Sequence, residues 1–81
     1  MTISEIIELD EVAEYIERHQ LTSRYLKATR YILSGATQNV DFKKRKPASA
    51  DIWQFKITDK YRAFCYIRGA TLVVSEINDH Q

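Results

Sequence analysis

The sequence is poor in the residues that mark several protein classes. Its 81 residues include one cysteine, one proline and two glycines. A single cysteine excludes an intrachain disulfide and fits a reducing compartment. No apolar run approaches the length needed to cross a bilayer, and the N-terminus lacks the basic region of a secretory signal. We therefore expect one cytoplasmic domain spanning residues 1–81, with no membrane partner.

The net charge of +1 is small, but the charge is distributed unevenly along the chain. Residues 1–20 hold six acids and one base, residues 21–68 hold eleven bases and three acids, and residues 69–81 hold two acids. This segregation lets a nearly neutral chain present a cationic surface to a polyanion. The alternative is a solvated acidic helix beside an ordinary basic surface.

Two helices are expected in the first half of the chain. Apolar residues follow helical spacing from Asp10 to about Gln20 and again over the next dozen residues. Thr22 or Ser23 is a suitable N-cap for the second helix, and Gly35 stands where a C-terminal glycine belongs. The short break between the helices predicts an antiparallel hairpin.

Two other segments are less regular. Residues 2–8 fit either a helix that opens with a capping box or a short edge strand. Residues 36–51 are mostly polar and contain four consecutive cations, for which we weigh RNA contact against a solvated loop. These cations are Lys43, Lys44, Arg45 and Lys46.

Three strands are expected from residue 52 onwards, because apolar and polar residues alternate there. If residues 58–60 form a three-residue hairpin loop, Ile57 pairs with Tyr61 and Lys56 lies opposite Arg62. This register brings the apolar faces of both strands together, whereas a slip of one residue does not. Cys65 falls on the apolar face, where we expect a small core residue and not a nucleophile.

The predicted register places Gln54, Phe64 and Tyr66 on the same face as Lys56 and Arg62. Aromatic rings beside cations are typical of surfaces that stack on unpaired bases. We expect Gln54 and Tyr66 to contribute to RNA binding. For Phe64 the alternative is packing beneath the basic loop.

Opposed like charges destabilise a sheet by about 0.2–1 kcal/mol, so a retained Lys56–Arg62 pair indicates a bound anion such as a phosphodiester. The alternatives are that Glu76 neutralises Arg62 or that Lys56 extends into water. The length of the loop at Gly69 decides which face Glu76 occupies, and the sequence leaves it open.

Two histidines are available for chemistry. His80 titrates near neutrality and suits general acid–base catalysis, whereas His19 is expected at a helix end. The sequence contains no metal-ligand spacing, no glycine-rich phosphate-binding loop and no nucleophile–histidine arrangement. We therefore expect neither a metal nor another cofactor.

The segments Trp-Gln-Phe-Lys-Ile (residues 53–57) and Tyr-Arg-Ala-Phe-Cys-Tyr (residues 61–66) resemble the RelE/ParE superfamily of bacterial toxins. The histidine at position 80 is similar to the C-terminal histidine of the YoeB-like and HigB-like branches. The resemblance implies an α+β fold in which a two-helix hairpin packs on a three- to four-stranded antiparallel sheet.

The resemblance also implies a toxin that a cognate antitoxin neutralises. RelE-like members cut mRNA on the ribosome without a metal, by attack of the ribose 2′-hydroxyl on the adjacent phosphate. Lys56 then resembles their functional strand lysine and Arg62 their phosphate-binding arginine, with His80 as general acid or base. Gln54 is a departure, since RelE-like toxins can carry a second lysine there, and no C-terminal extension supplies further arginine or tyrosine.

Two alternative functions stay open. The first is a ParE-like inhibitor of DNA gyrase that cleaves no RNA. The second is a non-enzymatic module that binds RNA or protein through the basic face. The sequence does not identify the antitoxin, the codon preference, the oligomeric state or the residue that acts as general base.

Overall fold

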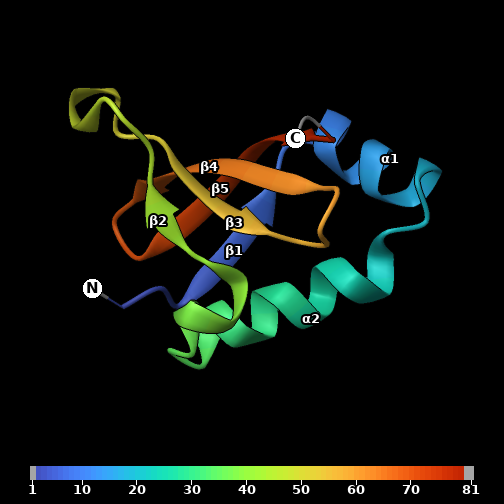
Figure 1. Cartoon of the computed structure of the whole chain (residues 1–81), viewed down its shortest axis with the longest axis horizontal. Helices are drawn as coiled ribbons and strands as arrows, with labels where there is room; N and C mark the ends of the chain where they lie inside the picture. The colour runs from blue at the N-terminus through green and yellow to red at the C-terminus, as the bar shows by residue number, and fades with distance from the viewer. Residues whose placement is uncertain (1, 80–81) are drawn as a thin grey trace.

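The structure, a computed structural model, describes residues 2–79. It is a small compact α+β fold of two N-terminal helices and a five-stranded mixed sheet, with strand order β1-β5-β4-β3-β2 (Figure 1). None of the helices in the described part of the chain has the length and apolar character that crossing a membrane requires. The elements are β1 (Glu5–Glu8), α1 (Asp10–Arg18), α2 (Thr22–Leu33), the 3-10 helix η1 (Thr37–Val40), β2 (Lys43–Lys44), the 3-10 helix η2 (Ala48–Ala50), β3 (Trp53–Lys56), β4 (Arg62–Arg68) and β5 (Thr71–Asn78).

The sheet differs from the expected three- to four-stranded antiparallel sheet in two ways. The segment that was ambiguous between helix and strand forms β1, which pairs in parallel with β5 from Glu5–Thr71 to Glu8–Val74. The basic run begins with a two-residue strand, β2, which adds to the edge of β3. Parallel pairing joins distant segments, so the local pattern of residues 2–8 could not reveal it.

Both helices end in a left-handed residue that satisfies their last carbonyl groups. Gln20 (φ 57°) follows α1, and Leu21 N–H donates to the Ile16 carbonyl. Gly35 (φ 86°) follows α2, where the next N–H, of Ala36, donates to the Tyr31 carbonyl. This is the Schellman arrangement, which confirms the predicted role of Gly35.

The starts of the helices depart from the sequence prediction. The N-cap position of α2 is Leu21, and neither Thr22 nor Ser23 caps the helix with its side chain. Leu21 is 5% exposed and belongs to the core, so its burial fixes where α2 begins. His19 is the C-cap residue of α1, as expected for a helix-end histidine.

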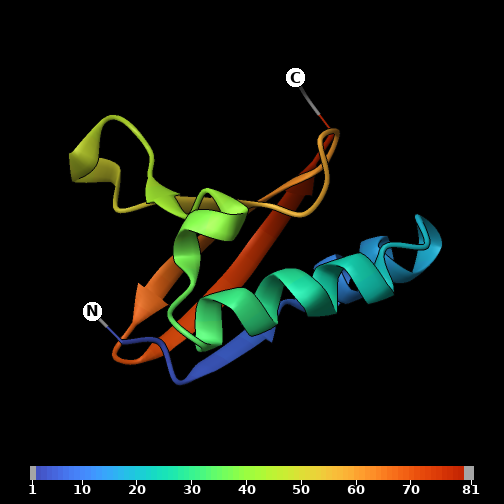
Figure 2. The same ribbon diagram turned by 60° about the horizontal axis from the view of Figure 1, so that its bottom comes forward.

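The helices pack against one face of the sheet, and the core lies between them (Figure 2). Residues that alternate along the strands point into this core, because successive side chains of a strand face opposite ways. The opposite face, which we name the outer face, is covered by neither α1 nor α2. The core residues with at most 3% exposure are Val12, Ala28, Ile32, Phe55, Ala63, Cys65, Leu72 and Val74.

Candidate functional site

The hairpin between β3 and β4 has the predicted register. Lys56 is the partner of Arg62. Ile57 N–H donates to the Tyr61 carbonyl at 3.0 Å, which closes the loop of residues 58–60. The Thr58 hydroxyl oxygen accepts hydrogen bonds from the N–H groups of Lys60 and Tyr61, at 3.1 and 3.0 Å. Threonine in this position fixes the turn, because its side chain replaces a missing backbone acceptor.

Two cross-strand rows of side chains form the part of the outer face around this pair. One row contains Lys56, Arg62 and Asn78, from β3, β4 and β5. The second row lies two residues along the strands, and it holds one aromatic ring among polar side chains. It contains Lys43, Gln54, Phe64 and Glu76.

The position of Glu76 depends on two local features of β5. The turn before β5 contains two residues, Gly69 and Ala70. Two-residue hairpin turns need a positive φ, which glycine adopts readily, and Gly69 has a φ of 64°. A bulge then shifts the register between Phe64 and Cys65, so that Glu76 faces Phe64. The carboxylate therefore shares the outer face without standing directly opposite Arg62.

Lys56 has a partner that the sequence analysis missed. Its Nζ lies 2.7 Å from the Asp59 carboxylate, in the hairpin loop three residues later. The hydrogen bond and charge of Lys56, with a smaller effect of Arg24, lower the pKa of Asp59. The sequence pointed to a bound anion or to water as the surroundings of the Lys56 ammonium group, and not to this aspartate. Asp59 is 98% exposed, so water screens this ion pair strongly.

Arg62 keeps its charge available. Its side chain is half-buried, and within residues 2–79 no carboxylate lies within ion-pair distance of its guanidinium group. The alternative in which Glu76 neutralises Arg62 is not what the structure shows, because Glu76 lies across from Phe64. Of the two opposed cations, Arg62 is thus the better placed to hold an anion.

In the basic run, two lysines form ion pairs with aspartates and one arginine stacks on an aromatic ring. Lys43 lies 3.3 Å from Asp41, and Lys44 lies 3.0 Å from Asp51. Arg45 instead places its guanidinium carbon 4.6 Å from the centroid of the Phe64 ring. This cation–π contact brings Arg45 onto the outer face beside the Lys56–Arg62 row. It also covers Phe64, in agreement with the alternative that this ring packs beneath the basic loop.

The remaining predicted site residues lie apart. Tyr66 is on the outer face two positions beyond Phe64, opposite Val73, with the Arg68 guanidinium 5.7 Å from its ring centroid. Lys44 pairs with Trp53, which places it on the opposite side from Gln54 and Lys43. Lys46 is exposed in the loop after β2. His80 lies outside the described residues.

Cys65 is a core residue, as predicted. Its thiol donates to the Trp53 carbonyl at 3.5 Å, and its exposure is 1%. Burial raises the pKa of the thiol to about 12, so the nucleophilic thiolate is scarce at neutral pH.

The sequence analysis also missed an aromatic cluster at the end of α1. The rings of Tyr15 and His19 stack with centroids 3.9 Å apart, and Tyr61 contacts both edge-on. Burial, and then the charge of Asp79, raises the pKa of Tyr15. Spacing of i and i+4 on one helix was the available signal. Tyr61 points toward the helices, so this cluster is separated from the outer face by β4.

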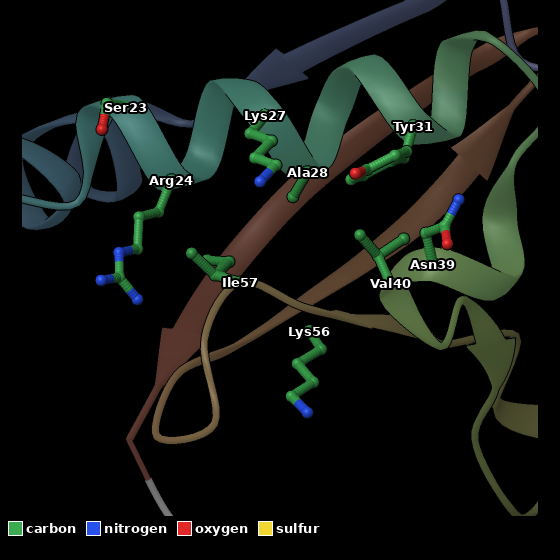
Figure 3. A pocket seen from close by; sticks show the side chains of 9 residues that line it. All are labelled: Ser23, Arg24, Lys27, Ala28, Tyr31, Asn39, Val40, Lys56 and Ile57. Atoms are coloured by element: carbon green, nitrogen blue, oxygen red, sulfur yellow. The ribbon is translucent and has the colours of Figure 1, made fainter.

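A groove runs between α2 and the β3–β4 hairpin, with a volume of about 550 Å³ (Figure 3). Arg24 and Lys27 project into it from α2, and Lys56 stands at its far rim with its amino group directed away from α2. Neither Arg24 nor Lys27 was singled out from the sequence. Their position one helical turn apart on one face of α2 was the signal that could have identified them.

Comparison with models of known families found no match, and comparison with curated proteins found none. Within residues 2–79, no three His, Cys, Asp or Glu side chains are grouped so that they could hold a metal ion. Any assignment of function therefore rests on the outer face and on the sequence motifs that form it.

Proposed function

We propose that the chain is a RelE-like toxin that cuts mRNA on the ribosome and thereby inhibits translation. One observation carries this proposal: Arg62, without a carboxylate partner in the described part of the chain, lies opposite Lys56 on the outer face. Arg45 reaches the same face from the basic run. Three cations on one face of a sheet suit the phosphodiester backbone of a single strand.

The proposed reaction is transesterification within the RNA. The ribose 2′-oxygen loses its proton to a base and attacks the adjacent phosphorus, while the bond to the 5′-oxygen breaks and that oxygen gains a proton from an acid. The products are a 2′,3′-cyclic phosphate and a free 5′-hydroxyl. The phosphorane that forms on the way carries extra negative charge, which positioned cations stabilise.

The residues of the outer face have distinct roles in this proposal. The planar guanidinium of Arg62 binds two phosphate oxygens at once, a geometry that lysine cannot offer. Lys56 neutralises the charge that develops on the phosphorane. His80 acts as general acid or base, and it follows by two residues Asn78, the partner of Arg62 in the sheet.

Binding of the substrate requires Lys56 to exchange partners. In the structure the Lys56 ammonium group pairs with the Asp59 carboxylate, and an incoming phosphate displaces this carboxylate. The exchange costs little, because exposed ion pairs contribute little to stability and the Asp59 side chain is already 98% exposed. The Asp59 carboxylate of the hairpin loop thus keeps the Lys56 side chain in place until a phosphate group replaces it.

The proposed partners are mRNA, the ribosome and a cognate antitoxin. A nuclease of this kind harms its own cell, so a neutralising protein must accompany it. The antitoxin is inferred from the sequence motifs of residues 53–66, and the cationic outer face is what such a protein would have to cover or distort.

The proposal is tested by expressing the chain under tight induction while growth, protein synthesis and mRNA 5′ ends are followed. We expect growth arrest with cuts at fixed positions within codons. Arrest with DNA damage and intact mRNA would identify a gyrase inhibitor instead, and absence of arrest would favour a non-enzymatic binding module.

The matched variants are Arg62→Ala, His80→Ala and Arg68→Ala. The first two should reduce cleavage by about 100-fold or more, enough to remove toxicity. Arg68 lies on the same strand and the same face as Arg62, but at the other end of β4, so its replacement controls for the loss of one positive charge. Full toxicity of both Arg62→Ala and His80→Ala would show that the site is wrongly assigned.

A further inference from the structure

The groove between α2 and the hairpin has a polar, cationic lining over a small apolar floor. The floor is made by Ala28, Val40 and Ile57, which are all buried. The rim carries two cations from α2 and several hydrogen-bonding groups, and among residues 2–79 no carboxylate lines it. The rim residues are Ser23, Arg24, Lys27, Tyr31, Asn39 and Lys56.

The two groove cations, Arg24 and Lys27, differ from the lysines of β2 and β3. Lys43, Lys44 and Lys56 each form an ion pair with an aspartate. Arg24 and Lys27, in contrast, form no ion pair with any residue between 2 and 79. Residues at i and i+3 of a helix lie about 5–6 Å apart at Cβ, so their charges repel and together favour an anion.

The field of the groove already acts on one anion. Besides Lys56, the charge of Arg24 lowers the pKa of Asp59, so the carboxylate at the hairpin tip senses cations from both α2 and β3. The positive potentials of the groove and of Lys56 therefore overlap. A polyanion that replaces Asp59 at Lys56 enters the same field.

Lys56 lies at the end of β3, beyond the residues that pair with β2. Within residues 2–79, that pairing covers only Trp53 and Gln54. Figure 3 shows the amino group of Lys56 directed away from α2, while its backbone borders the groove. Lys56 thus stands between the groove and the outer face.

We propose that the groove lined by Arg24 and Lys27 is a second phosphate-binding subsite, which holds the backbone of single-stranded RNA next to the nucleotides on the outer face. This inference rests on the proposed function, since the same strand is taken to reach Arg62. The ligand class is a single-stranded polynucleotide, bound mainly through its phosphates and without base-specific contacts.

An acidic peptide is the competing ligand, and the lining disfavours it. Peptide segments that dock in grooves gain affinity from apolar anchors in deep pockets. The floor here offers only Ala28, Val40 and Ile57, which the core already buries. The Ser23 hydroxyl, the Tyr31 hydroxyl and the Asn39 amide at the rim can instead donate to phosphate oxygens.

The test measures binding of a fluorescent 2′-O-methyl RNA strand, which cannot be cut because its 2′-oxygen is blocked. The protein is made by total chemical synthesis, which needs no ribosome, and fluorescence anisotropy is recorded from low to moderate salt. The variant is Arg24→Gln with Lys27→Gln. The matched control is Arg18→Gln with Arg30→Gln, which removes the same charge from exposed positions of α1 and α2 outside the groove.

The logarithm of the association constant falls linearly with the logarithm of the salt concentration. Loss of two phosphate contacts should make this negative slope smaller in magnitude by about 1.4. We expect an affinity loss of about tenfold at low salt for the groove variant, and at most about twofold for the control. Equal losses in the two variants would overturn the subsite, because only net charge would then matter. Far-UV circular dichroism and thermal melts establish that all variants are folded.

Arg62→Gln separates this inference from the proposed function. If the groove variant keeps its affinity while Arg62→Gln loses it, the subsite is wrong and the proposed site stands. If only the groove variant loses affinity, the groove binds RNA and the proposed catalytic face is wrong. Displacement of the RNA by polyglutamate at lower concentration than by polyuridylate would overturn RNA as the ligand.

Discussion

The two faces of the sheet, built from the same strands, have opposite properties. On β3 and β4 the inward residues Phe55 and Ala63 are fully buried, whereas their neighbours Lys56 and Arg62 are half-exposed on the outer face. Because successive side chains of a strand point to opposite faces, adjacent positions contribute either to the core or to the outer face. Substitutions one residue apart should therefore separate stability from RNA binding.

The largest expected effect is on the core. Phe55→Ala should lower the free energy of unfolding by about 3–5 kcal/mol, because it removes a large ring from a fully packed site. The control is Gln54→Ala, the preceding residue on the outer face, which should change stability by less than about 0.5 kcal/mol. Urea unfolding followed by tryptophan fluorescence measures both. Similar losses would mean that the outer face also holds the fold.

The second effect belongs to the outer face. Arg62→Ala should reduce cleavage of ribosome-bound mRNA by about 100- to 1000-fold, as for removal of a group that stabilises transition-state charge. Its free energy of unfolding should stay constant or rise by at most about 1 kcal/mol, since repulsion from Lys56 is removed. Primer extension and urea unfolding give the two values. A large loss of stability would make Arg62 a structural residue.

The third effect concerns the link between α2 and β1. The Tyr25 hydroxyl donates to the Glu8 carboxylate at 2.9 Å, and burial together with Glu8 raises the pKa of Tyr25. Tyr25→Phe should destabilise the protein by about 1–2 kcal/mol, because the bond is charge-assisted. Tyr31→Phe on the same helix is the control. Equal effects from the two variants would show that the hydrogen bond to Glu8 adds nothing.

The smallest expected effect is at the hairpin tip. Asp59→Asn should raise the affinity for uncleavable single-stranded RNA by about two- to fivefold, because Lys56 loses its carboxylate partner. Asp51→Asn, which frees Lys44 on the other side of the sheet, is the matched control. An equal gain from both variants, measured by anisotropy, would indicate an effect of net charge alone.

The antiparallel part of the fold could be predicted because its signals are local. The loop of residues 58–60 and the alternation around it fix the register of Lys56 with Arg62, and the structure confirms that register. The parallel β1–β5 pair could not be predicted. Ile6 and Ile7 fit a helix or a strand equally well, and the choice is made by packing against β5.

The site was predicted less completely than the fold. The shared face of Gln54, Lys56, Arg62 and Phe64 follows from strand alternation alone. The ion pair of Lys56 with Asp59 depends on the conformation of a loop, and the face of Glu76 depends on a bulge in β5. Arg24 and Lys27 line a groove only because α2 packs beside the β3–β4 hairpin. The residue pattern of a single helix does not predict such packing.

The parallel pairing of β1 with β5 has a consequence for synthesis of the chain. Glu5 finds its partner Thr71 only 66 residues later, so β1 cannot be completed while β5 is inside the ribosomal exit tunnel. The helices can form early, since their contacts are local, but the sheet closes only after translation of β5.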